Sequence, residues 1–195
     1  MATGQEQGGT AAKPLRADAR RNRARLLEVA EEVFAERGPG ASTEEVARAA
    51  GVGIATVFRH FPTKEALLEA VLVRRLERLA EEAQQLAEGR PPAEAFFDFF
   101  NLVVDRSPVK NAYAAALADA GVDVHAAVSD AGRAVSAALG GLLAAAQGAG
   151  AVRTDLEVPE LTAILVGTCR MLQHLDGRPD AARRARQVVL DGLRG

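Results

Sequence analysis

The sequence predicts an all-α protein of about nine helices, and three observations lead to this fold class. Alanine and leucine dominate the 195 residues, whereas strand-favouring aromatic residues are scarce, with one tyrosine and no tryptophan. Apolar residues recur three and four positions apart along most of the chain, which is the spacing of one helix face. Segments that contain glycine or proline separate these periodic stretches and set the helix ends.

The N-terminal part of the chain predicts an arm followed by one helix. Residues 1–17 lack apolar periodicity and contain mainly small and polar types, so we expect them to be disordered. Asp18 is a good N-cap residue, and the first helix should begin near it and end at a Gly-Pro-Gly segment, 38–40. Its core face would be formed by Leu26, Leu27, Ala30, Val33 and Phe34.

The next segment has the sequence form of a helix-turn-helix, in which a short glycine-containing turn joins two short helices. Ser42 and Glu45 stand at the N-cap and N3 positions of a capping box, which starts the helix before the turn. In the Gly-Val-Gly turn, 51–53, the first glycine would take the positive φ that ends a helix, and the valine would pack between the helices. The helix after the turn, 54–61, would present its N-terminal residues to base edges in the major groove.

Six further helices are predicted after the helix-turn-helix. Thr63 would cap the first of them, because Pro62 ends the preceding helix. A Ser-Pro pair at 107–108 is expected to separate two helices in the middle of the chain. The expected helices are 64–88, 93–105, 107–119, 124–149 and 159–175, and a last helix that follows the segment 177–179 and ends near 193.

Charge is distributed unevenly, although the formal net charge is only −2. This balance argues against a general electrostatic affinity for nucleic acid. Basic residues outnumber acidic ones up to residue 64, and acidic residues outnumber basic ones after it. A basic run from Lys13 to Arg25 precedes the helix-turn-helix, where it would either reach into a minor groove or only change the local potential.

Several classes of protein are not expected. The single cysteine, Cys169, allows no disulfide within the chain and fits a reducing cytoplasm, and the first residues do not resemble a signal peptide. Residues 134–152 carry no charge, but glycines interrupt the few large apolar residues, which favours a buried helix over a membrane span. No metal-ligand spacing, phosphate-binding loop or catalytic triad is present, so we expect neither an enzyme nor a cofactor.

The segment 51–67 closely resembles the TetR family of bacterial transcriptional regulators. The family pattern here is Gly-Val-Ser, two variable residues, Thr, an apolar residue, Tyr, a variable residue, and His or Tyr. The pattern then continues with Phe, two small residues and Lys-Glu-Ala-Leu. Residues 42–50 also fit the family's second helix, and the resemblance extends over about 20–70. After Leu79 only the architecture is similar, with a helical body whose last two helices usually dimerise.

The resemblance implies DNA contacts for a set of residues in and around the helix-turn-helix. Phosphate contacts would position the protein, and base contacts would specify the sequence. The implied base-reading residues are Ile54, Ala55 and Arg59. The implied backbone contacts are Thr43, Thr56, His60 and Lys64.

Two residues depart from the family pattern. Gly53 stands where Ser is usual, so a side-chain cap of the third helix and a phosphate contact are lost. Phe58 stands where Tyr is usual, which removes a hydroxyl that often bonds the DNA backbone; its ring would still pack against a thymine methyl group.

The helical body is rich in aromatic residues, with four of the seven phenylalanines between 96 and 100. They would form either a plain core or, as in TetR-like proteins, an apolar pocket with a few polar groups that binds a small molecule. The expected wall residues are Phe96, Phe100, Val103, Tyr113, Leu117, Val128, Leu139 and Leu143. The expected polar groups are Asn101, His125, Cys169 and His174.

The last two helices each carry an apolar stripe. If the other helices already close the body, these stripes are partly exposed unless a second copy covers them, and two-fold dimers are the commonest oligomers. Otherwise each stripe only completes the core of one subunit. The residues expected near the dimer seam are Leu165, Leu172 and Val189.

These observations divide the chain into an arm (1–17), a DNA-binding domain (18–64) and a domain for effector binding and dimerisation (65–195). The expected function is a repressor that leaves a palindromic operator when a small molecule binds. Two alternatives remain open. One is a helical protein-interaction module with a non-functional reader, and the other is an activator or a constitutive repressor without an effector.

Overall fold

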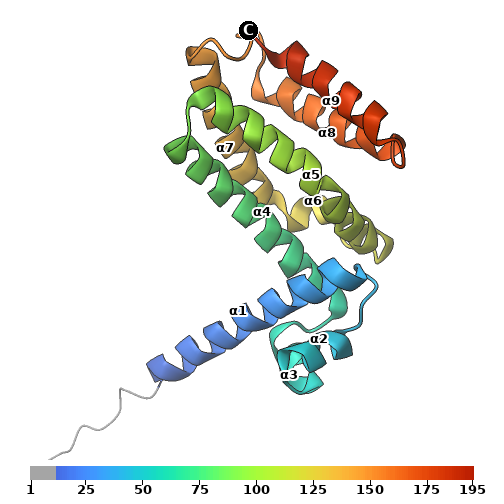
Figure 1. Cartoon of the computed structure of the whole chain (residues 1–195). Helices are drawn as coiled ribbons and strands as arrows, with labels where there is room; N and C mark the ends of the chain where they lie inside the picture. Colours follow the sequence, from blue (N-terminus) through green and yellow to red (C-terminus); the bar gives the residue numbers. More distant parts are fainter. Residues whose placement is uncertain (1–11) are drawn as a thin grey trace, which may run out of the picture. The chain divides into compact units, whose positions relative to one another are not determined.

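The computed structural model describes residues 12–195, and within them nine helices form and no strand does (Figure 1). The expected all-α fold class is confirmed. The helices are α1 (Ala12–Arg37), α2 (Thr43–Ala50), α3 (Ile54–His60), α4 (Lys64–Gly89), α5 (Pro92–Asp119), α6 (Val124–Ala127), α7 (Ser129–Gly148), α8 (Val158–His174) and α9 (Pro179–Leu193).

The start of α1 differs from the prediction. Most of the arm expected at 1–17 lies outside the described residues, but α1 already begins at Ala12, ahead of Asp18. Pro14 is compatible with this start because the amides of a first helical turn have no partner within the helix. Asp18 does not cap the helix; its carboxylate forms an ion pair with Arg21, one turn further along.

The chain divides into two compact units, with the boundary between Leu67 and Leu68, inside α4. The first unit contains the helix-turn-helix, and we call it the reader; the second, which we call the body, contains the rest of α4 and α5–α9. None of the described helices is both long enough and apolar enough to cross a membrane.

The core of the reader is formed by one face of α1 and the inner faces of α2 and α3. All five α1 residues predicted for this core are buried. They share it with Val46 and Ala47 of α2, Val57 of α3 and Phe61. Val52 does not join them, contrary to the prediction, because these side chains already fill the space between the helices; it is 36% exposed in the turn.

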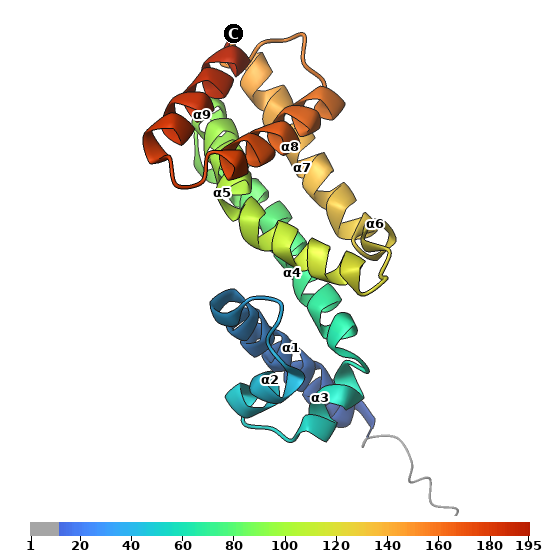
Figure 2. The same ribbon diagram turned by 90° about the vertical axis from the view of Figure 1, so that its right-hand side faces the viewer.

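The body is built around α5, which packs against α7 and α8, while α8 packs against α9 (Figure 2). Phe96, Phe99 and Phe100 are fully buried in its core, together with Leu161 of α8. Burying a side chain of this size stabilises a fold by roughly 1.5–3 kcal/mol. The body therefore owes most of its cohesion to apolar side chains from several helices.

The break predicted at Ser107-Pro108 does not occur, because α5 continues through both residues. Pro108 has no amide hydrogen to donate to the carbonyl of Val104, which would leave that group unpaired. The Ser107 hydroxyl donates to the Val104 oxygen instead, at 2.9 Å. A side chain thus supplies the missing hydrogen bond, and one helix replaces the two expected ones.

The helix predicted at 124–149 is in turn divided in two. Asp123 caps the short α6 by accepting a hydrogen bond from the amide of Ala126 at 3.1 Å. Val128 then leaves the helical conformation, with φ −105° and ψ 9°, before α7 begins. Two expected helices are joined in α5 and one is divided into α6 and α7, so the number of described helices is still the predicted nine.

Candidate nucleic-acid interface

The helix-turn-helix is held in shape by groups at its helix ends. The Ser42 hydroxyl accepts from the amide of Glu45 at 3.2 Å, and the Glu45 carboxylate accepts from the amide of Ser42 at 2.8 Å. The predicted capping box is therefore confirmed. Gly51 ends α2 with φ 67°, as predicted, in the left-handed region that side chains disfavour. Gly53 begins α3 without any side-chain cap.

Three side-chain contacts fix these helices to the rest of the reader. Arg37, at the end of α1, forms an ion pair with Glu45. The Lys64 ammonium donates to the carbonyl of Gly40 at 3.0 Å, and the guanidinium of Arg23 lies 4.7 Å from the centre of the Phe61 ring. The amide of Ser42, with Arg37 beside it, holds the pKa of Glu45 below its ordinary value. These contacts set the orientation of α3 within the reader.

The two faces of α3 differ in exposure. Val57 is fully buried, and Phe61 just after the helix is nearly so. On the opposite face Ala55, Phe58 and Arg59 are exposed, and the Phe58 ring is 41% exposed. Positions 55, 58 and 59 lie on one face because residues three and four apart are neighbours on a helix. The structure thus exposes Ala55, Phe58 and Arg59 together, whereas Ile54, the other residue expected to read bases, is half-buried.

The other residues expected to contact DNA are less accessible. Ile54, Thr56, His60 and Lys64 are half-buried, and the ammonium of Lys64 is already bonded to Gly40. Thr43 is almost fully buried at the start of α2. Arg59 differs from them, because its guanidinium has no ion pair or hydrogen bond with any other described residue.

The residues expected around a ligand pocket fall into three groups. Phe96, Phe100, Leu139, Leu143 and Cys169 are buried in one cluster, with Val103 packed against it. Tyr113 and Leu117 are buried outside this cluster, and Val128 is half-buried. His125 and His174 are exposed, so the structure does not bring them to this cluster.

Asn101 is the expected polar group with the most distinctive surroundings. Its side-chain oxygen Oδ1 is buried and accepts no hydrogen bond from any described residue. A buried polar atom without a partner costs free energy, and such atoms in native structures usually have a ligand, a water or a functional reason.

The three residues expected near the dimer seam on α8 and α9 face the core of their own subunit. Leu165 is buried in the core cluster, and Leu172 and Val189 are half-buried against it. Their neighbours are the exposed ones: Val166 is 51% and Val188 71% exposed. Both stripes are wide enough that sequence periodicity did not separate the core-facing residue from the outward-facing one.

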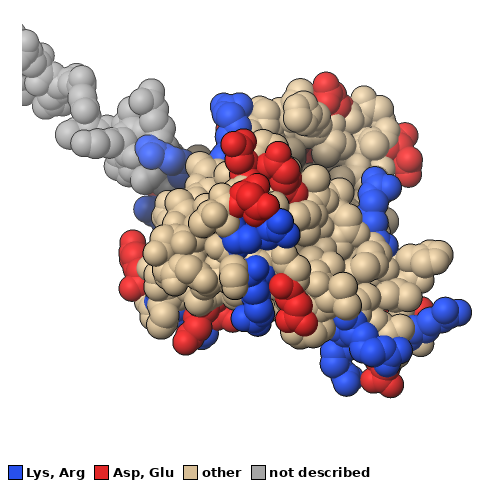
Figure 3. All heavy atoms as spheres, turned by 90° about the horizontal axis from the view of Figure 1, so that it is seen from above, with Lys and Arg blue, Asp and Glu red and all other residues tan. Residues whose placement is uncertain are grey.

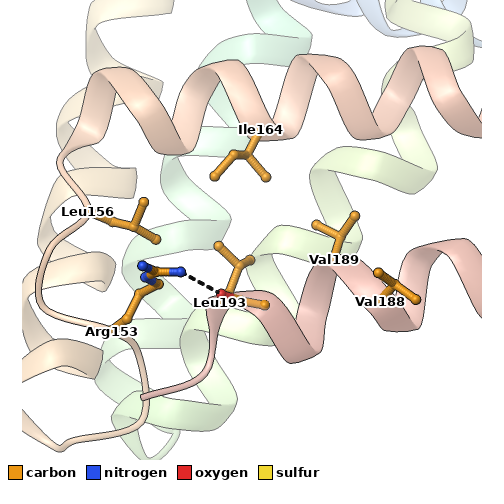
Figure 4. A pocket seen from close by; sticks show the side chains of 7 residues that line it. Arg153, Leu156, Ile164, Val188, Val189 and Leu193 are labelled. Atoms are coloured by element: carbon orange, nitrogen blue, oxygen red, sulfur yellow. Dashed lines mark hydrogen bonds between the residues drawn. The ribbon is translucent and has the colours of Figure 1, made fainter.

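A shallow groove of about 200 Å³ lies between α8 and α9 (Figure 4). Apolar side chains line most of it, and Arg153 closes one end, where its guanidinium donates to the carbonyl of Gly192 at 3.5 Å. The other lining residues are Leu156, Ile164, Val188, Val189 and Leu193. On the face shown in Figure 3, most of the surface is neither basic nor acidic, and the charged side chains lie in a few groups in which both signs occur.

Comparison with known proteins identifies the family of this chain. The family described as bacterial regulatory proteins, tetR family, matches residues 26–71. A second description, transcriptional regulator SbtR-like, C-terminal domain, matches residues 91–195, more than half of the chain. The chain belongs to the TetR family of bacterial transcriptional regulators.

Solved structures of other TetR regulators agree with this assignment along nearly the whole chain. The TetR transcription regulatory protein of Mycobacterium vanbaalenii is 43% identical, with 93% of this chain and 100% of that chain covered and a TM-score of 0.75. The TetR regulator SCO0520 of Streptomyces coelicolor is 35% identical, with 88% and 98% covered and a TM-score of 0.70.

The curated relatives match only part of their own length and of this chain. The uncharacterized HTH-type transcriptional regulator Rv1255c of Mycobacterium tuberculosis is 39% identical over 72 residues, which is 36% of either chain. The family match over residues 26–71 and the described fold of the reader point to the same element, the helix-turn-helix.

Proposed function

We propose that this TetR regulator is a repressor that binds a palindromic DNA operator as a homodimer and is released by a small molecule. The exposed face of α3 carries the proposal: it combines the unengaged guanidinium of Arg59 with Ala55 and Phe58, on the helix that enters the major groove in proteins of this kind. Its site of action would be the cytoplasm, where bacterial DNA lies.

Selection of bound sequences from random duplex DNA by the full-length protein tests this proposal. We expect an inverted repeat whose half-sites are about 34–36 Å apart, or a multiple of that. This spacing is one turn of the DNA helix, and it lets two readers related by a two-fold axis enter the major groove on the same side of the DNA. The variant Arg59→Ala is the matched control and should no longer enrich the same base at one position. Recovery of no preferred sequence would favour a protein-interaction module instead.

Dimerisation through α8 and α9 is supported by the exposed valines. Val166 and Val188 are two of the few large apolar side chains that the described surface exposes. Val188→Glu should give a folded monomer, because this side chain contributes little to the core of its own subunit while a charge in a dimer seam is costly. Gln187→Glu, an exposed neighbour on another side of α9, should remain dimeric in sedimentation. A Val188→Glu protein that stays dimeric would place the seam elsewhere.

Ligand response is supported by the aromatic cluster and by the buried oxygen of Asn101. A ligand can only release DNA if it binds one separation of the two readers better than another. Operator complexes challenged with a library of apolar molecules that carry one hydrogen-bond donor should be dissociated by some of them. If no compound of this class acts, the protein is better described as a constitutive regulator.

A further inference from the structure

We propose that Phe58 determines sequence specificity by contacting the C5-methyl group of a thymine in each operator half-site. The inference rests on the proposed function, since it needs α3 to lie in the major groove. It goes further by naming what the Phe58 ring contacts, which is the methyl group of one thymine. Neither a phosphate nor the edge of another base offers the same apolar group.

The position of Phe58 is the first step of the argument. Its ring is 41% exposed, on the face of α3 that Ala55 and Arg59 share. Val57 and Phe61 supply the buried contacts on the other side. The ring is therefore not needed to fill the core of the reader, and it stands in the row of side chains that would meet base edges.

The chemistry of the ring is the second step. A phenyl group has no hydroxyl, so it cannot hydrogen-bond to a phosphate or to the donor and acceptor groups of guanine, adenine or cytosine. The major groove presents one apolar group, which is the thymine C5-methyl. A ring held in that groove gains by removing this methyl group from water and loses wherever it covers a polar edge.

The neighbours of Phe58 are the third step. Ala55, one turn earlier, presents only a methyl group, and Gly53 before α3 presents no side chain at all. Small residues on this side leave the ring room to approach the floor of the groove. Arg59 is adjacent, and its guanidinium donors suit the edge of a guanine. Phe58 would therefore contact a thymine methyl group while Arg59 hydrogen-bonds to a neighbouring base pair.

The test replaces thymine by deoxyuridine, which lacks the C5-methyl group and is otherwise the same base. The operator obtained by selection is made with deoxyuridine at one symmetric pair of thymines at a time, and binding is measured by fluorescence anisotropy. At one pair the wild-type protein should bind roughly tenfold to twentyfold more weakly, because one buried methyl group contributes about fourfold for each half-site. At the other pairs the affinity should stay close to that of the unmodified operator.

The variant Phe58→Ala should bind thymine and deoxyuridine equally at this pair, while Phe58→Leu, which keeps an apolar group, should retain part of the difference. Val52→Ala is the matched control: it removes another exposed apolar side chain of the reader and should leave the ratio unchanged. The proposal is overturned if no pair is sensitive in the wild type, or if Phe58→Ala keeps the full ratio. Failure to select any operator would overturn the proposed function as well, whereas an operator without methyl dependence overturns only the role of Phe58.

Discussion

The reader and the body are stabilised in different ways. In the reader, helices of seven and eight residues are held by groups at their ends: the Ser42–Glu45 capping box, the left-handed Gly51 and the bond from Lys64 to Gly40. In the body, helices of up to 28 residues surround a cluster of fully buried phenylalanines. The two short helices of the reader depend on polar contacts at their ends in addition to its small apolar core, whereas the body depends mainly on a large apolar core.

This difference indicates which substitutions destabilise each unit. A short helix contributes few core residues, so losing a cap removes a large part of what defines it. A long helix tolerates altered ends because several turns remain packed. It also means that the outward face of α3 can be chosen for DNA contacts with little effect on the stability of the reader.

The largest effect should come from the core of the body. Phe100→Ala should lower the free energy of unfolding by about 3–5 kcal/mol, because it removes a fully buried ring and leaves a cavity. Phe97→Ala, on the same helix but half-buried, is the matched control and should cost clearly less. Hydrogen exchange, measured separately on peptides of the two units, should place the loss in the body. Equal losses for both variants would show that burial does not rank the contacts of α5.

An intermediate effect is expected on DNA binding with none on stability. Arg59→Ala should lose about 1–3 kcal/mol of discrimination at one base pair, because a bidentate contact to guanine disappears, and its melting temperature should match the wild type. Arg59→Lys keeps the charge but not the planar fork, so it should restore general affinity and not the base preference. Affinities for operators with single-base changes separate the two. A uniform loss over all operators would make Arg59 a phosphate contact.

A smaller effect is expected from the helix cap. Ser42→Ala should destabilise the reader by about 1 kcal/mol, because the amide of Glu45 loses its acceptor. Ser129→Ala is the control, since this serine begins α7 without capping it. Hydrogen exchange in α2 should rise for the first variant only. Unchanged hydrogen exchange in α2 of Ser42→Ala would show that the cap does not hold this helix, and the contrast between the two units would be wrong.

The smallest effect concerns pH. The pKa of Glu45 is lowered in the folded reader, so its contribution to stability is present above the ordinary pKa of a glutamate and is lost as the pH falls through the folded value. Glu45→Gln keeps a group that can accept from Ser42 but removes the pairing with Arg37. Its melting temperature should lie slightly below the wild type at pH 7 and converge with it only when the pH falls below the lowered folded pKa of Glu45. A difference that does not depend on pH would assign the effect to packing.

How well the sequence predicted the structure also differs between the units. In the reader the capping box, Gly51, the uncapped Gly53 and the cap at Thr63 are each determined by residues within four positions, and all four are found as predicted. In the body the helix breaks depended on tertiary context: a neighbouring hydroxyl allows α5 to pass Pro108, and a single valine separates α6 from α7. Periodicity located the stripes of α8 and α9 but not which valines point outward, because that depends on which helices cover them.

The serine–proline pair inside α5 replaces one backbone hydrogen bond of the helix by a side-chain hydrogen bond. Elsewhere in a helix a carbonyl is tied to the next turn by a backbone amide, whose position is fixed by its neighbours. At Val104 the tie is a hydroxyl that rotates about a single side-chain bond. At this turn α5 therefore has one backbone-to-backbone hydrogen bond fewer than elsewhere, and a side chain takes its place. The pair that was predicted to end the helix is thus accommodated within it, because the serine before the proline satisfies the carbonyl that the proline leaves unpaired.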